Sequence, residues 1–542
     1  MTSHHLIDAA IQDNLHHFRK RGALTVRPGY KIKNGWITSQ EAVVVTVKKK
    51  KASVAAKELI PSKIGGYATD VRQANVWQKL RHEDPEEYGN HMALQRPEYT
   101  QPEFPYERDA QSGQLLQPAK PHPTVAAQSA KPTVPYVPPS GASLDPVTDT
   151  MSLTLCASPD AGWLELGKFL EGIHSQLTVG MYDFTSAHVL DAVQTALNNK
   201  QGLSLVLDHP PLNHSADQSD EQTQAALAKQ LGKREQFAWA AEAKDPMVSK
   251  AIFPNAYHIK VAVKDGTIFW LSSGNWNNSN QPDINPFAAG ANKNKIDQIA
   301  KKSDRDWHAI VEHSGLASTF EVYLKNDLKQ ASSAQSGKTG AKSAATLPKA
   351  AKAASLEKPI VSQVSPGQYF EPFEIVNEKV TIQPVLTPDA GVGNYVQNFL
   401  KLINSATAKL YIQTQYIHPA DESKYPGLAA LIDAVKNKID SGVDVRIILS
   451  QYEATGPWLE KLQASGIDAS KVVRIQSGVH NKGFVVDGSV IALGSENWSG
   501  DGVERNRDAS LIIYHAGAAK YFEGIFLHDW NMLAKPHLIK EV

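Results

Sequence analysis

The sequence predicts an α/β protein built from two similar halves and preceded by a small α+β module. First, a polar motif occurs twice, because His258 and His480 are each followed 17 residues later by an asparagine. Second, Ser158-Pro-Asp-Ala-Gly162 returns as Thr387-Pro-Asp-Ala-Gly391 at the corresponding place in the second half. Third, apolar stretches with helix and strand periodicity alternate in the same order after each copy. Such alternation indicates α/β layers around a largely buried sheet.

The first 95 residues are predicted to form a small basic α+β module. Residues 1–80 contain 14 Lys or Arg against 5 Asp or Glu, including the run Lys48-Lys-Lys-Lys51. A helix is expected over 7–18, with strands near 24–26, 42–47 and 67–71. Basic segments attract the phosphates of a membrane surface or of nucleic acid. A run of four lysines is more commonly just a solvated strand end.

Two segments of biased composition divide the rest of the chain. Residues 96–148 are rich in Pro, Gln and Ser and are predicted to be a linker. Residues 328–365, with Ala, Ser and spaced lysines, are predicted to connect the halves flexibly. The two repeats are therefore expected at 149–327 and 366–542.

Each polar motif predicts a β-hairpin. Asp265-Gly266 and Asp487-Gly488 lie between runs rich in Val, Ile and Leu, which is a strong hairpin signal. A two-residue loop would pair Lys264 with Thr267 and, stepping outward, Lys260 with Leu271. The same count would place each motif histidine opposite a serine of the returning strand.

Side chains two residues apart on a strand share a face. The first hairpin is therefore expected to gather one polar set on one surface: His258, Lys260, Ser273 and Asn275. The second hairpin is expected to gather the equivalent set: His480, Lys482, Ser495 and Asn497.

This set of side chains suits a phosphodiester. Lysine supplies charge, and serine and asparagine supply neutral donors for phosphoryl oxygens. Histidine acts as nucleophile or as acid and base near neutral pH. With the two sets face to face, one imidazole would attack phosphorus and the other would protonate the departing alcohol, after which water would cleave the phosphohistidine. This scheme needs no metal, and we expect neither a metal site nor a cofactor.

The stretches from His258-Ile-Lys260 to Asn275 and from His480-Asn-Lys482 to Asn497 resemble the paired HKD motifs of the phospholipase D superfamily. The second copy matches fully, and the first has Ser272 where the family usually has glycine. The resemblance covers roughly residues 150–535. It implies two phospholipase D-like α-β-α repeats packed around a pseudo-twofold active-site cleft. It also implies a metal-independent phosphodiesterase, a hydrolase that works through a covalent phosphohistidine.

The resemblance also implies residue roles. His258 and His480 would be the nucleophile and the acid/base, and the habit of the family favours His258 as nucleophile. The phosphoryl oxygens would be held by Lys260, Lys482, Asn275 and Asn497, assisted by Ser273 and Ser495. In the family an acidic residue after the asparagine binds the catalytic imidazole, which indicates Asp508 and, at a displaced spacing, Asp306. Despite the name of the motif, Asp265 and Asp487 are expected to serve mainly as turn residues.

The first half is longer than the second around its motif. From Asp208 to His258 there are 50 residues, but from Ser450 to His480 only 30. After the motif, the first half again has about twenty residues more. Insertions of this length are commonly lids or binding loops, and surface decoration is an equally supported alternative.

The favoured substrate is a phospholipid at a membrane surface, cleaved by hydrolysis or by transfer. The alternative is an endonuclease acting on DNA or RNA, supported by the basic N-terminal module. A third alternative, a binding protein without activity, is opposed by two intact motifs. Because both half-sites lie in one chain, a monomer suffices.

The sequence also favours a soluble, cytoplasmic protein. The single cysteine, Cys156, excludes an intramolecular disulfide and fits a reducing compartment. The start lacks an apolar signal core, and no run of eighteen apolar residues occurs. Export without a signal is the remaining alternative. The formal net charge is zero.

Overall fold

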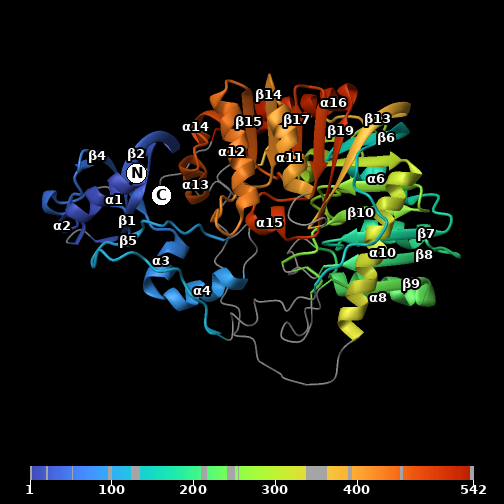
Figure 1. Ribbon diagram of the computed structural model, residues 1–542, viewed down its shortest axis with the longest axis horizontal. Helices are drawn as coiled ribbons and strands as arrows, with labels where there is room; N and C mark the ends of the chain where they lie inside the picture. The colour runs from blue at the N-terminus through green and yellow to red at the C-terminus, as the bar shows by residue number, and fades with distance from the viewer. Residues whose placement is uncertain are drawn as a thin grey trace.

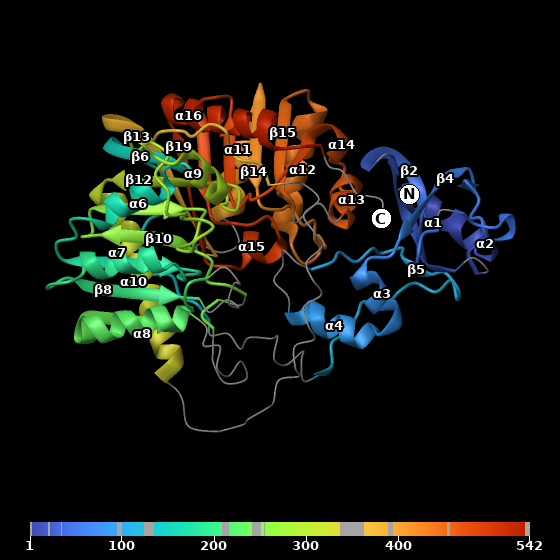
Figure 2. The ribbon, with the colours of Figure 1, turned by 180° about the vertical axis from the view of Figure 1, so that it is seen from behind.

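The computed structural model describes residues 3–536 except 20–21, 34, 52, 95–99, 124–134, 209–215, 241–250, 254, 337–362, 389–393 and 452–455. Two sheets organise these residues, one of five strands near the N-terminus and one of 14 strands in the rest. Figures 1 and 2 show the N-terminal module beside the large sheet, which is covered by helices on both faces. The predicted α/β fold class is confirmed.

The large sheet has two halves with the same strand order. The first half consists of β6 (Val147–Ser158), β7 (Gln176–Met181), β8 (Gly202–Leu207), β9 (Glu235–Trp239), β10 (Lys260–Lys264), β11 (Ile268–Ser272) and β12 (Asp306–Glu312). The second consists of β13 (Phe373–Thr387), β14 (Lys409–Thr414), β15 (Asp444–Ser450), β16 (Val473–Gln476), β17 (Lys482–Val486), β18 (Val490–Gly494) and β19 (Asp508–Tyr514). The order is β16-β15-β14-β17-β18-β19-β13-β6-β12-β11-β10-β7-β8-β9. Each half thus repeats the order of the other in reverse, about the antiparallel pair β13–β6.

The helices also occur in corresponding places. The first half contains α6 (Gly162–Leu170), α7 (Ala187–Ala196), α8 (Asp220–Leu231), the 3₁₀ turn η3 (Gly232–Arg234), α9 (Lys293–Ala300) and α10 (Ser314–Ser336). The second contains α11 (Asn394–Ser405), α12 (Pro426–Asp440), α13 (Pro457–Ala464), α14 (Ala469–Val472), α15 (Gly500–Glu504), α16 (Ala516–His528) and the π-helical turn η5 (Asp529–Leu533). Among the described residues, no helix has the length and apolarity needed to cross a bilayer.

One core joins the two halves. Apolar side chains of α10 and α16 pack on the same face of the sheet, in a cluster that draws residues from both halves. Within it, Trp307 of β12 stacks on Phe522 of α16 with ring centroids 4.3 Å apart. Separate clusters lie under α6, α7 and α8 in the first half and under α11 and α12 in the second. The shared cluster fixes the halves against each other, because apolar area removed from water stabilises the contact.

The predicted register of the motif hairpins is wrong by one residue. Lys264 pairs with Ile268 and Val261 with Leu271, so Lys260 is not the partner of Leu271. The turn leaves Thr267 outside the ladder, although its N–H still donates to the carbonyl of Lys264 at 3.1 Å. The second hairpin shows the same three-residue connection, since Val486 pairs with Val490.

The N-terminal module has a five-stranded sheet in the order β3-β4-β2-β1-β5. Its elements are α1 (Ser3–Asp13), α2 (His16–Arg19), β1 (Ala23–Lys33), β2 (Trp36–Val47), η1 (Ala56–Glu58), β3 (Lys63–Ile64), β4 (Tyr67–Gln73), α3 (Val76–Glu83), α4 (Pro85–Leu94) and β5 (Arg108–Asp109). Strand β5 pairs with β1 although it lies in the stretch expected to be a linker. The N-terminal part of that stretch therefore contributes to the module.

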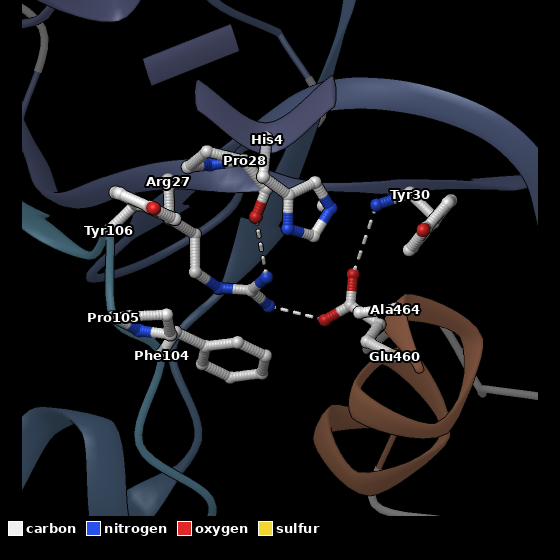
Figure 3. Close-up of a pocket in the computed structure, with 10 residues that line it drawn as sticks. His4, Arg27, Pro28, Tyr30, Phe104, Pro105, Tyr106, Glu460 and Ala464 are labelled. Carbon is white, nitrogen blue, oxygen red and sulfur yellow. Dashed lines mark hydrogen bonds and ion pairs between the residues drawn. The ribbon is translucent and has the colours of Figure 1, made fainter. Parts of the chain in front are cut away.

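A buried ion-pair cluster attaches the module to the second half. The guanidinium of Arg27 in β1 binds the carboxylate of Glu460 in α13 (Figure 3), and both side chains are nearly fully buried. Arg72 of β4 reaches the same carboxylate at 2.9 Å. Burial opposes the ionisation of Glu460, but the two arginines lower its pKa to about 2. The carboxylate is therefore held ionised between two cations.

Two further buried arginines bind across the interface between the halves. Arg507 precedes β19 in the second half and forms a two-pronged pair with Asp327 of α10 in the first, at 2.6 and 2.8 Å. Arg305 precedes β12 in the first half and binds Asp529 of η5 in the second, at 2.8 and 3.0 Å. Each arginine therefore ties its own strand to the last helical segment of the other half.

We expect Asp327→Ala to lower the free energy of unfolding by about 3–5 kcal/mol, because it leaves the Arg507 guanidinium buried without a counter-charge. Urea unfolding followed by tryptophan fluorescence measures this change. The matched control is Asp440→Ala, which removes the exposed partner of Lys436 and should cost no more than about 0.5 kcal/mol. Equal stability of the two variants would contradict the expected contribution of the buried Arg507–Asp327 pair to the free energy of unfolding.

Candidate active site

The backbone places each motif histidine beside the other half of the protein. The N–H of His258 donates to the carbonyl of Arg507 at 2.7 Å, and the N–H of His480 donates to the carbonyl of Arg305 at 3.1 Å. In return, the N–H of Arg507 donates to Ala256, and that of Arg305 donates to Gly478. These bonds bring the segments that lead into β10 and β17 to the centre of the molecule.

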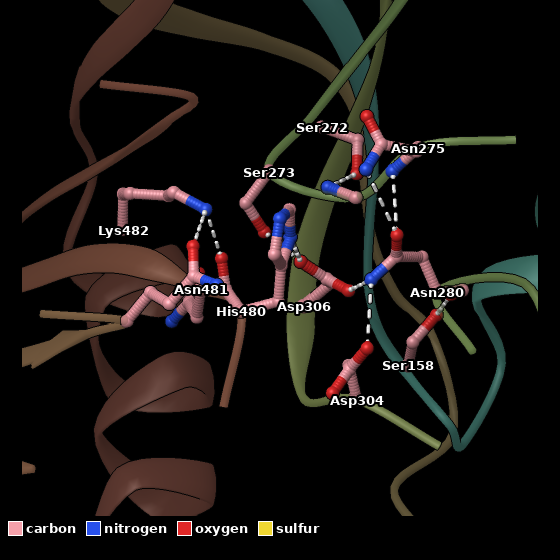
Figure 4. Close-up of polar contacts among 12 residues, drawn as sticks. Ser158, Ser272, Ser273, Asn275, Asn280, Asp304, Asp306, His480, Asn481 and Lys482 are labelled. Atoms are coloured by element: carbon pink, nitrogen blue, oxygen red, sulfur yellow. Dashed lines mark hydrogen bonds and ion pairs between the residues drawn. The ribbon is translucent and has the colours of Figure 1, made fainter. Parts of the chain in front are cut away.

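The two imidazoles meet there. Their ring centroids are 6.4 Å apart. The carboxylates are exchanged between the halves: Asp508 accepts from Nδ1 of His258 at 2.8 Å, and Asp306 accepts from Nδ1 of His480 at 3.0 Å. Figure 4 shows His480 beside Asp306. Because Nδ1 is bound in both rings, Nε2 is the nitrogen left for chemistry.

The serines hold these carboxylates. The Ser273 hydroxyl donates to Asp306 at 2.7 Å, and the Ser495 hydroxyl donates to Asp508 at 2.6 Å. The sequence predicts instead that these hydroxyls bind phosphoryl oxygens. The difference arises because each serine follows its strand at the point where the neighbouring strand begins with the aspartate. The serines therefore fix the acceptors of the imidazoles.

Both motif lysines are buried beside their histidines. Nζ of Lys260 donates to the carbonyl of His258, and Nζ of Lys482 donates to that of His480. Lys482 also lies 3.5 Å from Oε1 of Gln415. At the equivalent place in the first half, the Tyr182 ring lies under Lys260, 5.0 Å from Nζ, and meets His258 edge-on. Burial lowers the pKa of Lys260 well below its usual range.

The motif asparagines retain hydrogen-bonding capacity. The side-chain N–H of Asn275 donates to Asn280 at 3.2 Å. The carboxamide oxygens of Asn275 and Asn497 are buried and have no hydrogen-bond partner within the described ranges. Since the two ends of a carboxamide are assigned from their hydrogen bonds, each group can present a donor or an acceptor to a ligand.

One residue of the site has no signal in the motif. Asn280 lies in the insertion after the first motif, and its amide donates to Oδ2 of Asp306 at 2.8 Å (Figure 4). It also contacts Asp304 at 3.3 Å. The second insertion therefore supports a site carboxylate, which favours a functional role over surface decoration. Part of the first insertion, residues 241–250, lies outside the described residues.

Burial and nearby cations lower the pKa of both imidazoles. Burial, followed by the charges of Lys260 and Lys482, lowers the pKa of His258 well below its usual range. Burial and Lys482 lower the pKa of His480 to about 4, although Asp306 opposes this shift. A bound phosphodiester anion would offset the lysine charges and raise the imidazole pKa values again.

The motif aspartates lie at the turns, away from the imidazoles. Asp265 has a left-handed φ of 53°, and its carboxylate accepts from the backbone N–H groups of residues 174–176 at 2.7–3.0 Å. Asp487 has a φ of 50° and accepts from those of residues 407–409 at 2.8 Å. These hydrogen bonds fix the loops that lead into β7 and β14.

No group of three or more His, Cys, Asp or Glu side chains is arranged to hold a metal ion within the part of the chain that the structure describes. The arrangement instead presents two imidazole nitrogens, two ammonium groups and two carboxamides around one centre. These groups can bind a phosphoryl anion and exchange protons with its leaving group.

Comparison with known proteins gives matches to part of the chain. The family described as "Cardiolipin synthase, PLD-like domain" matches residues 399–530. Cardiolipin synthase of Listeria welshimeri is 28% identical over 150 residues, which are 26% of this chain and 29% of the relative. Cardiolipin synthase 2 of Staphylococcus epidermidis is 27% identical over 156 residues, 27% of this chain and 30% of the relative. The chain thus matches less than a third of the length of these relatives.

Solved structures give weaker likenesses. Phosphatidylserine synthase of Haemophilus influenzae aligns with a TM-score of 0.43 and 13% identity, over 71% of this chain and 89% of that one. The phospholipase D family member Nuc of Salmonella typhimurium aligns with a TM-score of 0.25 and 19% identity, over 29% of this chain and 97% of that one. The matched domain, together with two HKD motifs whose histidines meet at one centre, supports the phospholipase D superfamily for this chain.

Proposed function

We propose that the protein cleaves the phosphodiester of a phospholipid through a covalent phosphohistidine, with His258 as nucleophile and His480 as acid and base. The observation that carries this proposal is the pair of imidazoles with centroids 6.4 Å apart, each bound at Nδ1 by an aspartate of the other half. Such a pair can flank one phosphorus atom, with one ring on the side of attack and the other beside the leaving group.

The first step forms a bond from Nε2 of His258 to phosphorus and breaks the bond from phosphorus to the leaving alcohol. The His480 imidazolium gives its proton to the departing oxygen, so the leaving group departs as a neutral alcohol. The proton on Nδ1 of His258 stays in its bond to Asp508, and this carboxyl group offsets the positive charge that the ring acquires.

The second step returns the enzyme to its starting state. An acceptor hydroxyl attacks phosphorus while the neutral His480 takes the acceptor proton, and the bond between nitrogen and phosphorus breaks. Water as acceptor gives hydrolysis, and an alcohol gives transfer to a new phospholipid. Lys260 and Lys482 are placed to stabilise the phosphoryl oxygens in both steps, because they are held beside the two imidazoles before reaction.

A phospholipid is favoured as substrate because the family that matches residues 399–530 and the relatives that match about a quarter of the chain are described as cardiolipin synthases. Cardiolipin synthesis by this chemistry would join two phosphatidylglycerols and release one glycerol. Phosphatidylglycerol is thus both a candidate donor and a candidate acceptor.

Incubation with phosphatidylglycerol vesicles in EDTA should release glycerol and yield phosphatidic acid, cardiolipin or both. Mass spectrometry of the extracted lipids measures the products, and added ethanol should divert part of the phosphatidyl group to phosphatidylethanol. Single-stranded DNA, incubated in parallel, should remain intact. Nicked DNA with unchanged lipid would replace the proposal with a nuclease.

His258→Ala and His480→Ala should each lower turnover by at least about 10³-fold, because each ring has a separate chemical task. Both variants should keep the wild-type melting temperature within a few degrees, as measured by circular dichroism. His174→Ala, which changes an exposed histidine outside the site, is the matched control and should retain wild-type turnover. Normal turnover of either site variant would refute the assignment.

Asp306→Asn should lower kcat by about 10²–10⁴-fold with little change in KM, since the amide cannot stabilise the His480 imidazolium. Steady-state kinetics on the preferred lipid provides the measurement. The matched control is Asp297→Asn in α9, which changes a carboxylate that accepts from the Tyr369 hydroxyl at 2.7 Å and should lower kcat by less than about tenfold. Similar losses in the two variants would argue for a general structural effect.

A further inference from the structure

The two half-sites differ at the carboxylate that binds each imidazole. Asp306 has both oxygens bonded: Oδ1 accepts from Ser273 and His480, and Oδ2 accepts from the Asn280 amide at 2.8 Å. Asp508 uses Oδ1 in the same way, for Ser495 and His258. Its Oδ2 is buried and has no partner among the described residues.

This half-site contains a second carboxyl group, that of Glu496, which binds Ser495, the residue whose hydroxyl binds Asp508. Glu496 is fully buried; its Oε2 accepts from the Ser510 hydroxyl and, at 3.2 Å, from the N–H of Ser495. Its Oε1 has no partner in the described part of the chain. The half-site thus contains two unpartnered, buried carboxyl oxygens, one on Asp508 and one on Glu496.

The first half-site has no room for such a group. The residue that corresponds to Glu496 there is Gly274. A Cβ atom on Gly274 would lie 2.9 Å from Cγ of Asp306 and 3.0 Å from Cβ of Asn280. One half-site is therefore built around an amide donor and the other around an additional carboxyl.

We propose that Glu496 is a positioning residue that acts through Asp508, because the two buried carboxyls share one proton and so keep His258 neutral for attack. This inference rests on the proposed function. The shared proton reduces the negative charge that Asp508 presents to His258 and makes the ring less basic. Asp306 keeps its full charge and supports the His480 imidazolium, so the two rings take different roles.

Electrostatics around the pair supports a shared proton. Burial, followed by the charge of Glu496, raises the pKa of Asp508 well above its usual range, and burial raises the pKa of Glu496. Two buried carboxylates do not both ionise readily at close range. The charged or titratable groups that face the pair are Lys260, Lys482, His258 and Tyr395.

By contrast, burial opposes the ionisation of Asp306, but the charge and hydrogen bond of His480 hold its pKa at about 2. The two aspartates occupy equivalent positions, so the difference between them follows from their neighbours. The amide of Asn280 can only donate a hydrogen bond to Asp306. Glu496 is itself a carboxyl group, so it can share a proton with Asp508.

Glu496→Gln tests the proposal because glutamine would offer Asp508 the kind of amide donor that Asn280 offers Asp306. Asp508 would then carry the full charge, and the pKa of His258 should rise by about one pH unit. Histidine NMR titration of the full chain, with His258 assigned from His258→Ala, measures this shift without any substrate. An unchanged or lowered pKa of His258 would overturn the proposal.

If Glu496→Gln does not fold, a reciprocal variant in the first half-site tests the same proposal. Asn280→Asp adds a carboxyl beside Asp306, and the same titration should show a lower pKa of His480. No change in that pKa would count against proton sharing as the source of the difference. Glu58→Gln, at an exposed glutamate of η1, is the control and should alter neither titration.

Activity adds a second readout. Since His258 must be neutral to attack, activity is lost as pH falls through its pKa. The acidic limb of kcat/KM should therefore move to higher pH in Glu496→Gln, with KM on the alkaline side unchanged. An NMR shift in a protein that is inactive on phospholipids would contradict the proposed function while supporting the role of Glu496.

Discussion

The structure depends on the reciprocal bonding between each motif histidine segment and the Arg-Asp pair of the other half. The carbonyl of the arginine accepts from the histidine N–H, and the next residue supplies the carboxylate for the ring. The arginine side chain then binds a buried aspartate beyond the interface. Separating the halves would break the backbone bonds, the imidazole bonds and the ion pairs together, and desolvated ion pairs tolerate the loss of one partner poorly.

This arrangement explains how a symmetric scaffold can support an asymmetric reaction. Both halves have the same strand order, and each donates the same backbone hydrogen bond, from its motif histidine to an arginine of the other half. The surroundings of the two aspartates differ, because an insertion brings Asn280 to Asp306, whereas Asp508 shares its hydrogen-bond partner Ser495 with a second carboxyl group, Glu496. In the proposed mechanism, these local differences assign nucleophile and acid to separate rings.

The sequence predicts much of this site because short-range patterns encode it. The Asp-Gly turns locate the hairpins, and the period of a strand places His258 and Lys260 on one face. The predicted register is wrong by one residue because nothing in the turn sequence indicates that Thr267 lies outside the ladder. The crosswise pairing of Asp508 with His258 cannot be read from the chain, since spacing along the sequence does not reveal which half a side chain meets.

The sequence pattern also does not identify residues that act on the site from outside the motif. Asn280 lies among several asparagines of an insertion, and only its position in space distinguishes it. Likewise, no periodicity marks Glu460 as the anchor of the N-terminal module, because a charged residue on a helix is usually solvated. Long-range polar pairs of this kind depend on the packing of distant elements.

The most direct test of the central claim is to trap the covalent intermediate. Wild-type protein turning over a short-chain phospholipid would be stopped in alkaline denaturant, which preserves phosphohistidine, and its peptides analysed by mass spectrometry. We expect a phosphatidyl group on the peptide that contains His258 and none on the peptide that contains His480. The group on any other residue, or no modified peptide while product accumulates in the same samples, would contradict it.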